Sequence, residues 1–241
     1  MTDPSPLARV RDDIVAANRI LAGRGVLDGF GHVSARDPRR ADRFLLSRSL
    51  APALVTREDL MTFDLDAAPV DGDARTPYLE RFLHGAIYRR RADVHAIVHS
   101  HSSSVIPFTA SSVPLRAVHH VSGFLGSATP VFEMRERFGA TDLLVRSIAQ
   151  GDALAEALGT HAVVLMRGHG FCSVGPNVPV ATYRAIYTES NAAVQCNAIA
   201  LGGPVTYLDT DEAALADAVH VDVVMRPWSL WKARLDRPDD R

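Results

Sequence analysis

The most informative stretch of the chain reads Val94-His-Ala-Ile-Val-His-Ser-His-Ser-Ser-Ser104. The apolar centre between His95 and His99 predicts a buried strand, which then runs into small hydroxyl residues. Because side chains alternate faces along a strand, His99 and His101 point to one side and Ser100 points to the other. Two imidazoles on one face at the end of a buried strand can both reach one metal ion.

A third histidine follows a second apolar run far downstream. Residues 162–166 predict another strand, and Arg167-Gly-His169-Gly comes directly after it. Three histidine ligands leave a metal with open positions, as in catalytic rather than structural sites. The alternative is that all three are hydrogen-bonded polar residues at strand ends. The same-face pair and the glycine-flanked partner favour the metal site.

Composition sets the broad class. The 241 residues, 47% of them hydrophobic, can bury a full core, and no repeat or linker divides them, so we expect a single domain over residues 1–241. A formal charge of −2 gives no case for binding nucleic acid or an anionic membrane. Cys172 and Cys196 lack metal-ligand spacing. Without a signal peptide or a long apolar span, we expect a soluble cytoplasmic protein.

Helical and extended patterns alternate along the chain. Apolar spacing and capping residues predict helices at about 6–22, from Thr76-Pro77 through Ile87, across 142–157 with an offset at Gly151, at 180–201, and over 211–234 with an interruption at Pro227. Extended segments are expected at 30–36, 44–47, 95–99, 118–121, 128–131 and 162–166, with a hairpin at 65–72. This order predicts an α/β fold with antiparallel strands in the middle and helices on both flanks.

The order and spacing of the polar residues resemble the class II aldolase/adducin family over roughly residues 7–207. Glu80 lies on a helix, His99-Ser-His101 ends a strand, and His169 follows an apolar strand. The resemblance implies a three-layer α/β/α fold around a central, largely antiparallel sheet. It implies that the three histidines bind one divalent metal ion per chain (Zn, Mn, Fe or Co) and that Glu80 acts beside it as acid/base. It also implies a homotetramer with active sites between subunits.

Three segments depart from the sugar-phosphate aldolases of that family. Gly31-His32 stands where those enzymes have Gly-Asn, and Ser47-Arg48-Ser49-Leu50 replaces their Thr/Ser-Gly phosphate cradle. His119-His120 replaces a His-Tyr pair whose tyrosine donates a proton across a subunit interface. A backbone cradle needs glycine to approach a phosphate closely, and Leu50 does not allow it. A phosphorylated sugar is therefore disfavoured.

Four segments, three of which contain these departures, are similar to a decarboxylase branch of the family: Phe30-Gly-His-Val-Ser-Ala-Arg36, Leu45-Leu-Ser-Arg-Ser49 with Ala51-Pro52, His119-His-Val-Ser-Gly-Phe124, and Arg226-Pro-Trp228. This branch acts on ortho-hydroxy aromatic or pyridine carboxylates, or on related ring-cleavage products. The resemblance therefore implies a metal-dependent decarboxylase of aromatic catabolism with a small carboxylate substrate. Two alternatives stay open. One is a retro-aldolase or epimerase on a non-phosphorylated sugar acid, and the other is an adducin-like assembly module.

Loss of CO2 leaves negative charge on a ring carbon, and a chelating metal can serve as template and Lewis acid for that charge. A proton must also reach the carbon. Glu80 is the first candidate for this step, the alternative being a solvated carboxylate paired with His84. His120 is the second, since histidine titrates near neutrality, the alternative being a packed or interface histidine.

The loops equivalent to the aldolase phosphate site supply candidate partners for a substrate carboxylate: His32, Ser47, Arg48 and Ser49. An arginine fork suits a carboxylate. Arg36 is a further candidate, the alternative being a surface position beside Asp37. Trp228 and Trp231 either close an aromatic pocket or cap a core or an interface.

Overall fold

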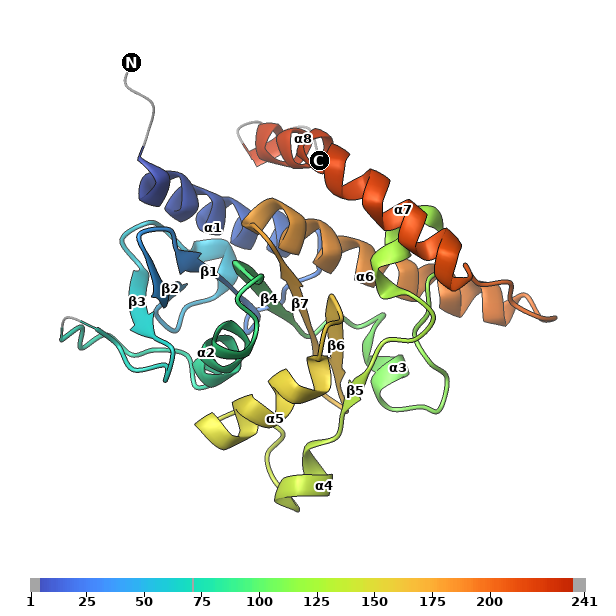
Figure 1. Ribbon diagram of the computed structural model, residues 1–241, viewed down its shortest axis with the longest axis horizontal. Helices are drawn as coiled ribbons and strands as arrows, with labels where there is room; N and C mark the ends of the chain where they lie inside the picture. Colours follow the sequence, from blue (N-terminus) through green and yellow to red (C-terminus); the bar gives the residue numbers. More distant parts are fainter. Residues whose placement is uncertain (1–4, 71, 236–241) are drawn as a thin grey trace.

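The computed structural model describes residues 5–70 and 72–235, and a seven-stranded sheet lies at its centre (Figure 1). In chain order the strands are β1 His32–Asp37, β2 Arg40–Ser47, β3 Leu60–Asp64, β4 Ala96–Ser100, β5 Val131–Phe132, β6 Val163–Met166 and β7 Gly170–Gly175. They lie in the spatial order β3-β2-β1-β4-β7-β6-β5. All neighbouring pairs are antiparallel except β5 and β6. The expectation of a largely antiparallel central sheet is confirmed.

Helices cover both faces of this sheet, so the predicted three-layer α/β/α arrangement is also confirmed. The helices are α1 Pro6–Gly23, α2 Arg81–Arg90, α3 Ile106–Thr109, α4 Met134–Phe138, α5 Ile148–Leu158, α6 Val178–Ala200, α7 Thr210–Val223 and α8 Met225–Leu235, with short 3-10 helices η1 Pro52–Leu54 and η2 His120–Leu125. One hydrophobic cluster joins the sheet to α1, α6 and α8. A second joins the opposite face to α2 and α5.

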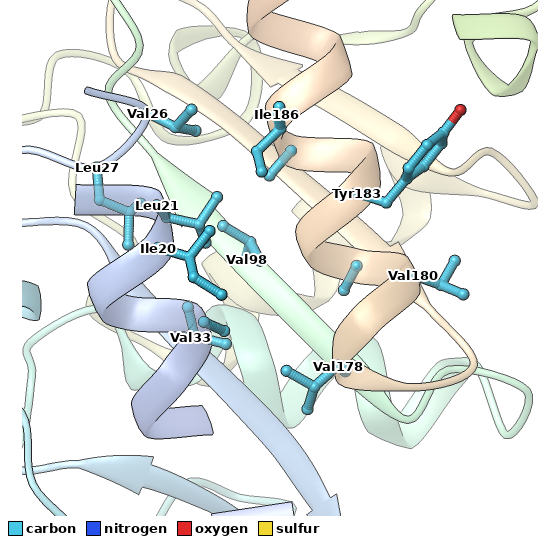
Figure 2. Close-up of a cluster of buried hydrophobic side chains, with 14 of the residues drawn as sticks. Ile20, Leu21, Val26, Leu27, Val33, Val98, Val178, Val180, Tyr183 and Ile186 are labelled. Carbon is cyan, nitrogen blue, oxygen red and sulfur yellow. The ribbon is translucent and has the colours of Figure 1, made fainter. Parts of the chain in front are cut away.

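Figure 2 shows the first of these clusters, where Leu21 of α1 and Ile186 of α6 lie on either side of Val98 of β4. Alternation along β4 sends the next side chain, Ile97, into the opposite cluster. His99 has the same parity as Ile97, so it also lies on the side of the sheet that α2 and α5 cover. Packing of the two faces thus decides on which side the histidines emerge.

Strand β1 follows the same rule. Val33 and Ala35 pack in the cluster with α1 and α6, whereas His32 and Ser34 face α2. The antiparallel register places His32 directly opposite His99 on β4. Polar side chains of two neighbouring strands therefore gather beneath α2.

The predicted start of α2 is wrong. Pro77 does not open the helix, because it pairs in an antiparallel bridge with Arg48 and is therefore extended. The helix begins instead at Arg81, with Glu80 as its N-cap residue. Leu79, an apolar residue within the predicted helix, precedes the observed one and is 54% exposed. Tertiary pairing overrides the local Thr-Pro signal here.

Helix α5 begins at Ile148 rather than at 142, and it runs through Gly151 without a break. A Cβ atom at Gly151 would lie 2.6 Å from the carbonyl oxygen of Phe82. The glycine therefore permits close packing of α5 on α2 and does not offset the helix.

Three other expectations need correction. The segment 118–121 is not a strand, because η2 begins at His120. The break in the C-terminal helical region falls at Val224, and Pro227 lies within the first turn of α8, where proline is tolerated. The hairpin predicted at 65–72 begins earlier, because its first arm is β3 and Phe63 forms a bridge with Pro69. Residue 71 of the predicted hairpin lies outside the described residues.

No helix in the described ranges is long and apolar enough to cross a membrane.

Candidate metal centre

Three histidines meet where β4 ends. His99 lies on β4, His101 follows it by two residues, and His169 occupies the turn between β6 and β7. A Cβ atom at Gly170 would lie 2.0 Å from the carbonyl oxygen of Ser100, so glycine is required for this turn to approach β4. The Nε2 atoms of His99 and His101 are 3.1 Å apart, and those of His101 and His169 are 3.0 Å apart.

Glu80 completes the cluster from the N-terminus of α2. Its Oε2 atom lies 3.4 Å from Nε2 of His99 and 3.4 Å from Nε2 of His169. Its Oε1 atom accepts a hydrogen bond of 3.0 Å from the backbone N–H of Val145. The alternative of a solvated carboxylate paired with His84 is wrong, because both side chains are buried and no hydrogen bond between them occurs within the described ranges.

The contact made by Nδ1 of each imidazole determines whether its Nε2 carries a proton. Nδ1 of His99 lies 3.2 Å from the carbonyl oxygen of Phe171, and Nδ1 of His169 lies 3.0 Å from that of Leu143. A carbonyl oxygen only accepts, so each Nδ1 carries the proton and each Nε2 presents a lone pair. Nδ1 of His101 likewise faces the Asp28 carboxylate at 3.2 Å. Three lone pairs thus converge on one point.

The electrostatics of the cluster favour a cation. Burial alone would raise the pKa of Glu80, but the adjacent His99 and His169 imidazoles lower it well below its usual range, so the carboxylate is ionised. Burial, together with His99 and His169, lowers the pKa of His101 to about 4. Burial would lower the pKa of His169, yet the nearby negative charge of the Glu80 carboxylate raises it overall.

The donor set fits a divalent metal. One ligand atom from each of Glu80, His99, His101 and His169 lies within 4.8 Å of the other three. Metal–nitrogen bonds of about 2.1 Å place two adjacent ligand nitrogens about 3.0–3.4 Å apart, which the observed spacings of 3.0 and 3.1 Å match. Imidazole and carboxylate donors suit Zn, Mn, Fe or Co.

A cavity of about 590 Å³ opens onto this cluster. It is lined by Phe30, His32, Ser49, Tyr78, Leu79, Glu80, His101, Asp142, Leu143, Leu144, Gly168 and His169. Apart from Glu80 and the histidines, the wall is largely aromatic and aliphatic. Such a wall suits a flat ring better than a polyhydroxylated chain.

The structure distributes the predicted substrate residues unevenly. His32 and Ser49 line the cavity. Ser47 is buried behind it, with its hydroxyl 3.4 Å from that of Tyr78, and Arg48 forms a 2.7 Å ion pair with Asp59. Neither Ser47 nor Arg48 is among the described lining residues, so their predicted roles stay predictions.

His120 lies elsewhere in the chain, exposed at the start of η2, with its ring centroid 5.0 Å from that of His220. It is not among the lining residues identified in the described ranges. Its role as a proton donor also stays a prediction.

Arg36 is neither a substrate ligand nor a surface residue. Its buried guanidinium donates to the carbonyl oxygens of Ala41, Tyr88, Val94 and Arg91. Trp228 and Trp231 do not close the pocket, because both are buried in the cluster beside α1 and α6. Their core-packing alternative is the correct one.

Sequence reasoning missed several residues at the site. Asp28 anchors His101, and the carbonyl of Leu143 anchors His169. Tyr78 packs its ring against His32, with centroids 4.5 Å apart. Tyr78 lies two residues before Glu80, which was a usable signal, whereas a backbone carbonyl at Leu143 leaves no trace in the sequence.

Comparison with known proteins agrees with this geometry. Residues 12–196 match the family described as the Class II Aldolase and Adducin N-terminal domain. The chain belongs to this family. It is 39% identical over 240 residues to Decarboxylase tropJ from Talaromyces stipitatus, covering 90% of each chain. It is 31% identical over 231 residues to 3,4-dihydroxyphthalate decarboxylase from Arthrobacter keyseri, covering 88% of this chain and 89% of the relative.

The fold recurs in a crystal structure of an aldolase II superfamily protein from Pseudomonas syringae, with a TM-score of 0.80 and 23% identity. The match covers 98% of this chain and 96% of the other. The resemblance predicted from the histidine and glutamate spacing, including its decarboxylase relatives, is confirmed.

Proposed function

We propose that the chain is a metal-dependent decarboxylase of an ortho-hydroxy aromatic or heteroaromatic carboxylate, such as a dihydroxyphthalate or a hydroxypyridine dicarboxylate. The observation that carries the proposal is the convergence of His99, His101, His169 and Glu80 on a cavity with an aromatic and aliphatic wall. The two decarboxylases related to the chain over most of its length support it. That the chain is a lyase is confirmed by its family and relatives. Its product is the open question.

The alternative product is an aldehyde, from a retro-aldolase or an epimerase. A sugar phosphate would need cationic or glycine-rich contacts for its phosphate. None of the described residues that line the cavity is lysine or arginine, and Arg48 nearby is paired with Asp59. A non-phosphorylated sugar acid stays the alternative substrate, although Phe30 and Leu144 offer its hydroxyls no hydrogen bonds. An adducin-like assembly module would have no use for four converging ligands.

When bound by the three histidines, a divalent cation would supply a template and a Lewis acid for vicinal substrate oxygens. The chain's own residues would do the rest. Ser49 and His32 line the wall and would hold the substrate carboxylate or hydroxyl groups. Oε1 of Glu80 accepts from the backbone N–H of Val145, so Oε2, the oxygen that faces His99 and His169, would carry the proton. The overall change is balanced, since the bond between the ring carbon and the carboxylate breaks, CO2 leaves, and the ring carbon takes up one proton.

We further propose that residues 1–241 act as one domain within a homotetramer. In that assembly His120, exposed on η2, would reach the site of a neighbouring subunit as a second proton donor. Support for this role comes from the replacement of the aldolase tyrosine by His120 and from the ability of an imidazole to donate near neutrality. Sedimentation of the purified protein tests the assembly.

A substrate panel tests the reaction. The zinc- or manganese-loaded protein is mixed with 3,4-dihydroxyphthalate, a hydroxypyridine dicarboxylate and a non-phosphorylated aldonic acid, and both CO2 and aldehyde are assayed. CO2 from an aromatic acid without aldehyde is the expected result. Aldehyde alone would move the assignment to the aldolase alternative. If neither CO2 nor aldehyde forms from any of these acids, the proposal of a decarboxylase loses its support.

A further inference from the structure

A buried chain of hydrogen bonds leads from the cavity wall into the protein interior. Nδ1 of His32 lies 2.8 Å from Nε2 of His84. Nδ1 of His84 lies 2.7 Å from Oγ of Ser34, which in turn lies 2.7 Å from the hydroxyl of Tyr88. All four residues are at most 1% exposed. The reaction proposed above uses only the first of them.

The chain has a simple structural origin. His32 and Ser34 are two residues apart on β1, so both face α2. His84 and Tyr88 are four residues apart on α2, so both face β1. The two-residue spacing on β1 and the four-residue spacing on α2 bring the four side chains into one continuous row of hydrogen bonds. Among these four, only His32 reaches the cavity.

A count of the protons shows which group donates in each of these hydrogen bonds. The two neutral imidazoles and the two hydroxyls carry four protons, whereas the three contacts hold only three. Both nitrogens of His84 are engaged, so the remaining proton belongs to Tyr88, Ser34 or His32. A remaining proton on Tyr88 or Ser34 would be a buried hydroxyl hydrogen without an acceptor, because neither hydroxyl has another acceptor among the described residues. Such a hydrogen is costly.

Only the arrangement with the remaining proton on His32 satisfies every buried donor. Tyr88 donates to Ser34, Ser34 donates to Nδ1 of His84, and Nε2–H of His84 donates to Nδ1 of His32. The proton of His32 then sits on Nε2, the polar atom left for the cavity that this ring lines. No hydrogen bond to that atom occurs in the described part of the chain.

We infer that Ser34, His84 and Tyr88 are positioning residues that lock His32 as an Nε2–H donor to a substrate oxygen. The role of the substrate oxygen rests on the proposed function, whereas the tautomer of His32 does not. A fixed donor selects groups that accept a hydrogen bond, such as a carboxylate or a phenolate oxygen, and it disfavours groups that present only donors. The hydrogen bonds from Tyr88 through Ser34 and His84 to His32 therefore add selectivity for the carboxylate or phenolate oxygens of an aromatic acid.

The test is the tautomer of His32, read by ¹⁵N NMR on the zinc-loaded, ¹⁵N-histidine-labelled protein. The signal is assigned by its loss in His32→Gln. Two variants of His84 with similar side-chain volumes separate the effect of its hydrogen bonds from the effect of its packing. His84→Gln keeps an N–H donor toward His32 and a carbonyl acceptor toward Ser34. His84→Leu removes both.

We expect a protonated Nε2 on His32 in the parent protein and in His84→Gln, and intermediate shifts on both ring nitrogens in His84→Leu. The Leu variant should also lose more than tenfold in kcat/KM, mainly through KM, with unchanged zinc content, while His84→Gln retains most of kcat/KM. A protonated Nδ1 in the parent protein, or an unaltered His32 tautomer in His84→Leu, would overturn the inference. Failure to release CO2 from any acid would instead count against the proposed function and leave the tautomer result standing.

Discussion

Nδ1 of His101 lies 3.2 Å from each carboxylate oxygen of Asp28, so a charged group outside the metal cluster orients one of its ligands. Partners of this kind fix the ring and raise the basicity of its other nitrogen. Asp28→Asn keeps an oxygen for the backbone N–H groups of Phe30 and Gly31 but removes the charge. We expect zinc affinity to fall by about 10–100-fold, measured by competition with a chelating dye.

Asp142→Asn is the matched control for that measurement. Asp142 is a carboxylate on the cavity wall, where it pairs with Arg146 rather than with a histidine. Its neutralisation should leave zinc affinity within about twofold, since it orients no ligand. Equal losses in the two variants would mean that Asp28 acts only through the general charge of the cavity.

Glu80→Gln tests the proton-transfer role. The amide keeps an oxygen for Val145 N–H and nearly the same volume, but it cannot exchange a proton. We expect kcat to fall by about 10²–10⁴-fold, the usual contribution of general acid–base catalysis, with the folded structure retained. Glu136→Gln on α4 serves as a surface control. Undiminished kcat in Glu80→Gln would assign the proton to another group.

Removal of the metal should destabilise the protein. The three Nε2 lone pairs converge without a proton between them, so the cation offsets their mutual repulsion as well as adding binding energy to the folded state. We expect a strong chelator to lower the thermal midpoint measured by calorimetry and added zinc to restore it. His101→Ala should show the low midpoint with or without zinc. A chelator effect of the same size in that variant would point to a different binding site.

Arg36→Met tests a structural rather than a substrate-binding arginine. The substitution leaves the carbonyl oxygens of Tyr88 and Val94 without their buried donor. We expect a loss of about 3 kcal/mol in the free energy of unfolding, measured in urea. Substrate KM should stay within about twofold, because the guanidinium does not line the cavity. A large rise in KM at unchanged stability would restore the substrate role.

The convergence of the three histidines was predictable because its signals are local. Strand alternation places His99 and His101 on one side, and the glycines around His169 mark a turn that approaches a neighbouring strand. The three-layer fold followed from the order of helices and strands and from the family resemblance. The same alternation rule also explains why His32 joins the site.

What failed depends on tertiary contacts. Arg36 resembles a surface cation in the sequence, but both faces of β1 are covered, so its guanidinium must find acceptors inside. The Thr76-Pro77 pair resembles a helix start, but Pro77 pairs with Arg48, a residue that follows β2 and is remote in sequence. No local pattern reveals such partners.

The most direct test of a metal-dependent decarboxylase is the rate of CO2 release from 3,4-dihydroxyphthalate as zinc or manganese is titrated into metal-free protein. We predict a rate near zero without metal that rises and saturates at about one equivalent per chain, with His161→Ala, an exposed histidine, behaving as the parent and His101→Ala staying inactive. Full CO2 release by the metal-free protein, or equal activity of His101→Ala, would contradict the account.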